Sequence, residues 1–280
     1  MIGLPLSFVL PEVHRAISAR RWGWDQQLAI AEQEMSEHSN SLGQLIGEPV
    51  PTWTERRKPP RAPMTGRYCV LEPLEPRRHG RDLFEAASTD AEGRIWTYLP
   101  YGPFASHEAY VGWMLMTCMG DDPQFHAIID SASGKALGVA SFLRIDPRGG
   151  AIEVGHICLS PPLQRSRVAT EAMFLMMKRV FDEIAYRRYE WKCDALNAPS
   201  RGAAKRLGFT YEGIFRQATV YKARNRDTAW FAIIDKEWPA LKSAFETWLD
   251  SDNFDAQGRQ KQRLSQLTAS ALEVTRTPAE

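Results

Sequence analysis

The alternation of hydrophobic and polar residues becomes regular at Gly66, and from there it predicts seven β-strands. Their ranges are 67–74, 124–130, 136–146, 151–159, 188–196, 209–221 and 228–235. The alternation is strictest in 188–196, where Tyr189, Trp191, Cys193 and Ala195 would face the opposite side from Glu190, Lys192 and Asp194. Turn-forming residues fill 131–135 and 147–150. Residues 124–159 are therefore predicted to form a three-stranded meander.

Helical spacing of hydrophobic residues predicts five helices between and after these strands. They cover residues 76–88, 106–119, 167–184, 200–207 and 237–249. Ser106 is suited to cap the second of them, and Gly208 to end the fourth. The order of elements indicates an α/β fold, more closely an α+β mixed sheet. We expect this sheet to be central, mostly antiparallel and flanked by helices on both faces.

The two ends of the chain differ from this regular part. Residues 1–65 are predicted to be an N-terminal extension and linker, because 49–63 is rich in Pro, Arg and Lys. A helix is expected in 12–34, and the polar stretch from Met35 has the composition of a natural chain start, so residues 1–34 are suspected not to be native. Residues 66–250 would form the folded domain, and 251–280 a polar tail with marginal helix.

Composition excludes several classes of function. The net charge of +1 gives no strong field for nucleic acid or for an anionic membrane. No stretch has the ~20 apolar residues of a spanning helix, and no signal peptide is recognised. The four cysteines, Cys69, Cys118, Cys158 and Cys193, form no C-x-x-C pair and have no histidine cluster beside them. We therefore expect no disulfide framework, no metal site and a cytoplasmic location.

Candidate chemistry begins where a strand leads through a short loop into a helix, at Ala151–Ala172. The first amides of a helix lack internal partners, and the helix dipole adds positive charge there. Residues 164–169 are thus placed to wrap a diphosphate, and Arg165 and Arg167 add charge. A strand-to-helix loop of this composition is also often a mere connection.

A second segment, Asn197–Phe209, follows the next strand and opens a short helix. The two segments together resemble the GCN5-related N-acetyltransferase (GNAT) family, which has Q/R-x-x-G-x-G/A at the first site and N-x-x-S/A followed by L-G-F at the second. Gln164 and Ala169 match the first motif, but Arg167 replaces its usual glycine. The resemblance covers about 66–249 and is nearest to the branch of ribosomal-protein alanine acetyltransferases.

The resemblance implies a GNAT-type acyl-CoA N-acyltransferase fold and the use of acetyl-CoA. The acetyl group would move to a primary amine by direct attack in a ternary complex, with no metal. The strand 151–159 would splay from its neighbour to admit pantetheine. The implied coenzyme contacts are Ile157, Cys158, Leu159, Gln164, Arg165, Ser166, Arg167, Val168, Ala169, Thr170, Asn197, Ser200 and Lys205.

Three residues are candidates for proton transfer. Glu153 would act as general base through water, or it is a structural acid bonded to an arginine or a neighbouring strand. His156 is an alternative base, although a lone strand histidine is more often structural. Ser200 would protonate the leaving thiolate, or simply cap the next helix. Ala204 stands where many relatives carry a tyrosine acid, which shifts weight to Ser200. Cys158 lacks a base partner, so a packed thiol is expected there.

The acceptor site is expected at an aromatic loop. Trp96, Tyr98, Tyr101 and Phe104 fall where the family builds its acceptor pocket, but they also suit a packed loop. The acceptor is a peptide N-terminus or a small-molecule amine, and the protein is expected to be a monomer or homodimer. Two other functions remain open: transfer from a different acyl-CoA, and a catalytically silent coenzyme A-binding regulator. A dehydrogenase is disfavoured because no G-x-G-x-x-G follows a strand.

Overall fold

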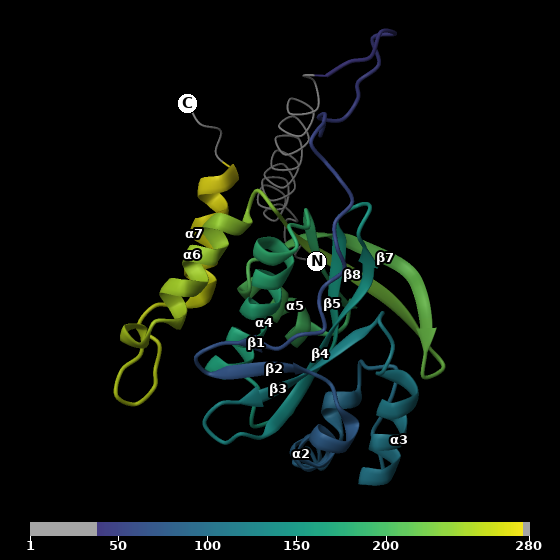
Figure 1. The fold of residues 1–280 in the computed structure, drawn as a ribbon, viewed down its shortest axis with the longest axis vertical. Coiled ribbons are helices and arrows are strands. Elements are labelled where there is room, and N and C mark those ends of the chain that lie inside the picture. Colours follow the sequence, from purple (N-terminus) through teal and green to yellow (C-terminus); the bar gives the residue numbers. More distant parts are fainter. Residues whose placement is uncertain (1–37, 277–280) are drawn as a thin grey trace, which may run out of the picture. The chain divides into compact units, whose positions relative to one another are not determined.

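The computed structural model describes residues 38–276, and a mixed sheet of eight strands organises them (Figure 1). The strand order is β1-β2-β3-β4-β5-β6-β8-β7. All neighbouring strands are antiparallel except β5 and β6, which are parallel. The predicted α/β class, with a mostly antiparallel mixed sheet and helices on both faces, is confirmed.

The strands follow the predicted ranges closely. They are β1 Met64–Thr65, β2 Cys69–Pro73, β3 Gln124–Asp130, β4 Ala136–Asp146, β5 Ala151–Leu159, β6 Arg188–Asp194, β7 Thr210–Tyr221 and β8 Arg224–Ile234. Only β1 has no counterpart in the sequence prediction. It pairs with β2 through Met64 and Leu71, and so extends the sheet by one short edge strand.

The α-helices are α2 Pro76–Ser88, α3 His107–Thr117, α4 Arg167–Lys178, α5 Ala198–Arg206, α6 Trp238–Leu249 and α7 Leu264–Arg276. A single π-turn, Arg179–Glu183, prolongs α4, and a 3-10 turn, Arg94–Trp96, lies inside the aromatic loop. Ser106 caps α3, because its hydroxyl accepts a hydrogen bond from the amide of Ala109. No helix of residues 38–276 has the length and apolar content needed to cross a bilayer.

The core has two parts, one on each face of the sheet. On one face α4 lies against β1, β2 and β3, and its Ala172, Met173 and Met176 share one buried cluster with Ile152 of β5 and Tyr189 of β6. On the other face α2 and α3 cover β3 and β4 in a smaller cluster rich in aromatic side chains. Figure 1 shows these two helices on their own side of the sheet, with α6 and α7 side by side elsewhere. All four cysteines are free and buried.

The chain divides between Thr54 and Glu55 into two compact units. Of the first unit the structure describes residues 38–54, which form a turn closed by a bridge between Ser39 and Leu45. The helix expected in 12–34 and the chain start suspected at Met35 lie outside the described residues.

The Pro-rich residues 55–63, read from the sequence as linker, pack within the second unit. Arg179 is buried and donates to the carbonyl oxygens of Pro60, Ala62 and Pro63, the closest at 2.5 Å from Ala62. Gln124 also donates to the carbonyl of Pro59 at 3.1 Å. Proline has no amide hydrogen but keeps its carbonyl acceptor, so the prolines of this segment bind through their carbonyl oxygens.

The expected polar tail contains a well-formed helix. Leu264 and Thr268 of α7 are buried, and Leu267 and Ala271 pack against the main core. Trp248 at the end of α6 donates to Gln260 at 2.8 Å, which closes the connection between the two helices. The folded part therefore continues well past residue 250.

Candidate active site

A gap opens between the two central strands. β5 and β6 pair only from Ala151–Arg188 to Val154–Trp191, although β5 continues to Leu159 and β6 to Asp194. Beyond Val154 the edge of β5 that faces β6 has no strand partner in the described part of the chain. Except for the Leu159 carbonyl, which accepts from Gln164 Nε2 at 3.0 Å, its backbone groups are available to an extended ligand, as the family resemblance implies.

A bulge in β5 lies directly at this gap. Against β4, residues Gly155 to Cys158 span three steps while Ser141 to Val139 span two. His156 takes up the extra residue with φ of 50°, a left-handed conformation that is unfavourable for a residue with a side chain. Such strain persists only where surrounding structure enforces it, and it is concentrated at functional sites.

The His156 ring is held by an aromatic partner. It stacks on Tyr101 with ring centroids 5.7 Å apart, and its Nδ1 lies 3.2 Å from the Tyr101 hydroxyl. Burial, and after it the charges of Arg144 and Arg226, lower the pKa of His156 to about 4. The imidazole is therefore neutral at pH 7 and weakly basic, which argues against His156 as the main base.

The loop after β5 presents unpaired amides to one end of the gap. Ser166 caps α4 by accepting from the amide of Ala169 at 3.0 Å, and Arg165 has φ of 58°. Within the described residues the amides of Arg165, Arg167 and Val168 have no hydrogen-bond partner. Three free amides at a helix N-terminus fit a diphosphate group.

Arg167 stands where the family motif usually has glycine, and the structure has room for its larger side chain. It begins α4 with helical geometry, so its amide is directed like that of a glycine. The guanidinium lies over Tyr68, 4.9 Å from the ring centroid, and over Phe254, 4.7 Å from that centroid. Cation–π contacts with both rings hold the side chain in place.

Two further coenzyme candidates lie near α5. Asn197 caps this helix by accepting from the amide of Ser200 at 3.1 Å. The Ser200 hydroxyl accepts from Trp191 Nε1 at 3.0 Å, so its own proton remains for donation. Lys205 is exposed in the last turn, whereas Arg206 reaches back and donates to Thr170 of α4 at 3.2 Å. Arg206 therefore lies closer to the amide loop than the sequence suggests.

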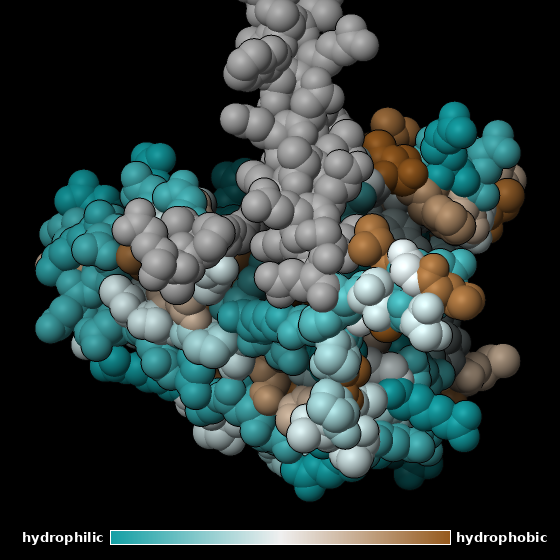
Figure 2. Space-filling model, turned by 90° about the horizontal axis from the view of Figure 1, so that it is seen from above, coloured by the Kyte–Doolittle hydropathy of each residue, from teal (hydrophilic) through white to brown (hydrophobic). Residues whose placement is uncertain are grey.

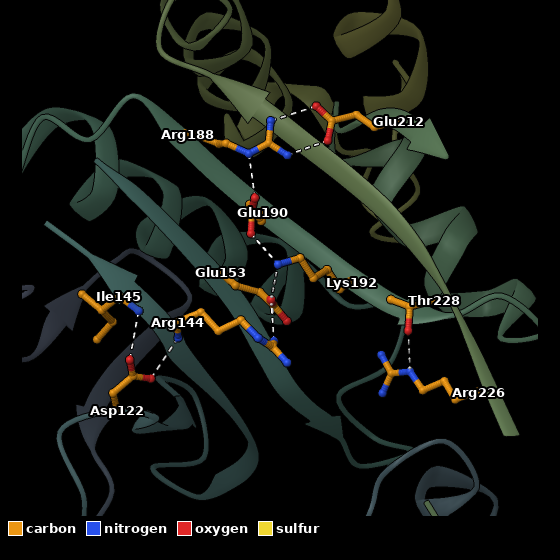
Figure 3. A network of polar contacts seen from close by, with 10 residues as sticks. All are labelled: Asp122, Arg144, Ile145, Glu153, Arg188, Glu190, Lys192, Glu212, Arg226 and Thr228. Carbon is orange, nitrogen blue, oxygen red and sulfur yellow. Dashed lines mark hydrogen bonds and ion pairs between the residues drawn. The ribbon is translucent and has the colours of Figure 1, made fainter. Parts of the chain in front are cut away.

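Glu153 lies on the sheet face opposite α4, in a chain of ion pairs (Figure 3). Its side chain is only 4% exposed, and one oxygen contacts Arg144 Nη1 at 2.6 Å and Lys192 Nζ at 3.1 Å. Burial raises the pKa of Glu153, while the two cations partly offset that rise. The bonds to Arg144 and Lys192 agree with the prediction of a structural acid, and the raised pKa is compatible with the alternative prediction of a general base.

The remaining members of this network were not singled out in the sequence. Lys192 also contacts Glu190 at 2.6 Å, and Arg188 contacts Glu190 at 2.6 Å and Glu212 at 2.5 Å. The available signal was the charged side of the alternating strand 188–196. Charges on the exposed side of an edge strand are ordinary, but here the strand is central.

The aromatic loop forms a packed cluster beside the bulge. Trp96 is 5% exposed and meets Phe104 and Tyr101 edge-on, with ring centroids 5.4 and 6.1 Å apart. Tyr98 stands apart and donates to the carbonyl of Leu196 at 3.2 Å. Tyr101 therefore touches His156 directly, while Trp96 supports the cluster from within.

Cys158 is not suited to be a nucleophile. Its side chain is buried, and burial raises the pKa of its thiol to about 12. It is therefore a neutral thiol packed in the second core cluster, as the sequence indicates.

Comparisons with known proteins agree with this geometry. The profile described as "Acetyltransferase (GNAT) domain" matches residues 69–210. A GCN5-related N-acetyltransferase from Brucella melitensis is 48% identical, with 79% of this chain and 100% of that chain covered and a TM-score of 0.77. A probable GNAT acetyltransferase from Chromobacterium violaceum is 41% identical, with 70% and 98% covered and a TM-score of 0.66.

A more distant structure resembles the fold alone. RimL, a ribosomal L7/L12 alpha-N-protein acetyltransferase solved with coenzyme A, is 20% identical, with 62% of this chain and 98% of that chain covered and a TM-score of 0.51. No curated protein matches the chain.

Proposed function

Because the chain belongs to the GNAT family of acetyltransferases, we propose that it transfers the acetyl group of acetyl-CoA to a primary amine, on a protein N-terminus or on a small molecule. The gap between β5 and β6, which ends at the three free amides of the α4 loop, is the observation that carries this proposal. Acetyl-CoA supplies an activated thioester; the protein has to align the amine, remove its proton and protonate the thiolate.

The coenzyme arm fits the backbone of β5 and the start of α4. Free amides at Arg165, Arg167 and Val168 suit the diphosphate. The unpaired edge of Ile157, Cys158 and Leu159 suits the amide-bearing pantetheine arm. A backbone N–H at the bulge would stabilise negative charge that develops on the acetyl oxygen.

Glu153 is the base that we propose. A carboxyl group with a raised pKa accepts a proton more readily than an ordinary one, and Glu153 is the only carboxylate of β5 among the described residues. It would act through water rather than by direct contact. Arg144 and Lys192 keep its position fixed.

Ser200 is the acid that we propose, because Trp191 occupies one acceptor site of its hydroxyl and orients it. Ser200→Ala should lower kcat by about tenfold or more, within the usual range for a proton-transfer group, while coenzyme A affinity changes little. The helix-cap function of Asn197 is independent of the Ser200 side chain. An unchanged kcat would leave Ser200 with a structural role only.

The branch of the family is also a proposal. Val168–Ala172 and Phe209–Gly213 are similar to ribosomal-protein alanine acetyltransferases. RimL shares the fold, and its acceptor is a protein N-terminus. A peptide N-terminus is therefore a leading acceptor for this chain, beside small amines.

A coupled assay tests the proposed function. Calorimetry should show binding of coenzyme A, and release of free thiol from acetyl-CoA should depend on an added amine. The amine panel should contain peptides, polyamines and amino acid derivatives. Binding of coenzyme A without turnover on any amine would replace the enzyme by a coenzyme sensor, and absence of binding would contradict the whole assignment.

A further inference from the structure

One sheet face carries the reacting end of the gap and is here called the acceptor face. It is the side of β5, β6 and β8 that bears Glu153, Lys192 and Thr228, and it lies opposite the side that packs on α4. In the proposed function the coenzyme binds at the α4 loop, which leaves this other side of the sheet for the amine acceptor. The charges on the acceptor face therefore limit which charged groups an acceptor can have.

Most of these charges are already matched. Three cations and three carboxylates alternate through the network of Figure 3, and the group sums to zero. Its members are Arg144, Glu153, Lys192, Glu190, Arg188 and Glu212. The network thus offers no net charge to an arriving substrate.

Arg226 of β8 is a cation of this face that lies outside the network. Its Nε donates to the Thr228 hydroxyl at 3.2 Å, and its Cζ lies 5.9 Å from the Tyr221 ring centroid. It is partly buried and makes no ion pair within the described residues. The nearby carboxylates hold other donors: Asp194 accepts from Tyr221 at 2.8 Å, and Asp227 from the amide of Gln217 at 2.8 Å.

The position of Arg226 is fixed by strand register. Thr228 faces Asp194, the last residue of β6, three residues past the final β5–β6 pair at Trp191. Arg226 follows on the same face, just past the end of β6, whose other edge borders the open part of the gap. The charge of Arg226 contributes to the lowered pKa of His156 in β5, which agrees with this position.

The guanidinium is oriented for a planar anion. Thr228 takes the Nε hydrogen, which leaves the two terminal nitrogens without a partner among the described residues. A carboxylate or phosphate can accept hydrogen bonds from both terminal nitrogens of a guanidinium simultaneously, and arginine suits this geometry better than lysine does. A partly buried cation without a counter-ion also attracts an anion more strongly than an exposed one.

We propose that Arg226 binds an anionic group of the acceptor, so that the acceptor is an amine that also carries a carboxylate or a phosphate. This inference rests on the proposed acetyl transfer and narrows its substrate class. It favours acidic peptides, amino acids and phosphorylated amines over polyamines. The neutral network beside Glu153 then receives the amine end.

Matched acceptor pairs test the inference. Each pair differs in one charged group: the amide-blocked peptides Ala-Asp-Ala and Ala-Asn-Ala, glycine and glycinamide, and phosphoethanolamine and methoxyethylamine. We expect kcat/KM to favour the charged member of at least one pair by about tenfold or more, in the range of a charged hydrogen bond. The pair with the largest ratio of kcat/KM, charged member over neutral member, shows whether Arg226 prefers a carboxylate or a phosphate.

Two variants assign that preference to Arg226. In Arg226→Gln the ratio within a pair should fall to near one, while kcat/KM for the neutral member stays within about threefold. Arg226→Lys should keep part of the preference, which separates charge recognition from a folding defect. Arg216→Gln removes a positive charge from the same hairpin, close to Asp227, and should leave the ratio unchanged.

The outcomes separate the two proposals. Transfer without preference for the charged member, or a preference that persists in Arg226→Gln, overturns the inference and leaves acetyl transfer intact. Failure to acetylate any amine overturns the proposed function, and the inference falls with it.

Discussion

A buried histidine on β3 makes stability depend on pH in a way that one substitution can isolate. The His126 side chain is 0% exposed, and neither ring nitrogen has a hydrogen-bond partner in the described part of the chain. Its ring meets Phe142 edge-on at 5.5 Å. Burial, and then the charge of Arg179, lower the pKa of His126 to about 4.

The sign and size of the effect follow from that pKa. The folded state holds His126 neutral, while the unfolded chain protonates it near its ordinary value of 6.5. Unfolding therefore takes up a proton, and stability is present above pH 6.5 and lost as pH falls towards 4. At about 1.4 kcal/mol per pKa unit, the full loss is about 3 kcal/mol, of which about 2 kcal/mol falls between pH 7 and pH 5.

His126→Leu tests this reasoning. Leucine is apolar and similar in size, so the variant removes two unsatisfied ring nitrogens and the titration together. Urea unfolding of both proteins at pH 7 and pH 5 gives two stability differences. We expect the free energy of unfolding of the variant, relative to that of the unsubstituted protein, to be about 2 kcal/mol higher at pH 5 than at pH 7. A fixed packing effect of leucine cancels in this comparison, so an equal difference at both pH values would refute the argument.

The remaining predictions concern stability and the site. Glu171→Gln should lower the free energy of unfolding by about 2–4 kcal/mol, because the buried carboxylate accepts from three backbone amides at 2.6–2.8 Å; urea unfolding that shows less than 1 kcal/mol would contradict this. Arg167→Ala should lose about 1–2 kcal/mol with its two cation–π contacts, yet keep coenzyme A affinity within about threefold by calorimetry if only the amide binds. Glu153→Gln should lower kcat by about 10²-fold or more and remove the rise of rate with pH through the raised pKa, whereas Glu190→Gln, a control in the same ion network, should keep that rise. Identical pH–rate profiles for the two variants would exclude Glu153 as the base.

Local pattern was sufficient for most of the fold. The bounds of β3, β4, β5 and α2 agree with the sequence prediction residue for residue, because each has a clear period and ends at turn-forming residues. The buried face of α4 was predicted for the same reason. These features depend on near neighbours in the chain.

Features that depend on distant partners were not predictable. Residues 55–63 have the composition of a linker, and Arg179, which donates to three of their carbonyl oxygens, lies 116 to 119 residues further along. Helix α7 lies in a stretch whose polar composition was read as a tail, and it packs on α6 and the core. On the face shown in Figure 2 hydrophobic residues stand in small separate groups, so exposure alone did not mark an interface there.

The candidate site shows the same division. The amide loop and the cap at Asn197 were found from motifs, because a helix start has a local signature. The left-handed backbone of His156 and the free charge of Arg226 have none. Both follow from the register of strands that are far apart in the chain.

The ion network also explains where the gap begins. Glu153 and Glu190 stand directly opposite each other in the β5–β6 pair, an arrangement that is unfavourable for like charges. Lys192 resolves it by contacting both carboxylates, at 3.1 and 2.6 Å. This contact lies beside Val154 and Trp191, the last paired residues before the strands separate. Loss of Lys192 would leave the buried Glu153 and the half-buried Glu190 facing each other, so the cation holds the strands together next to the point where their pairing ends.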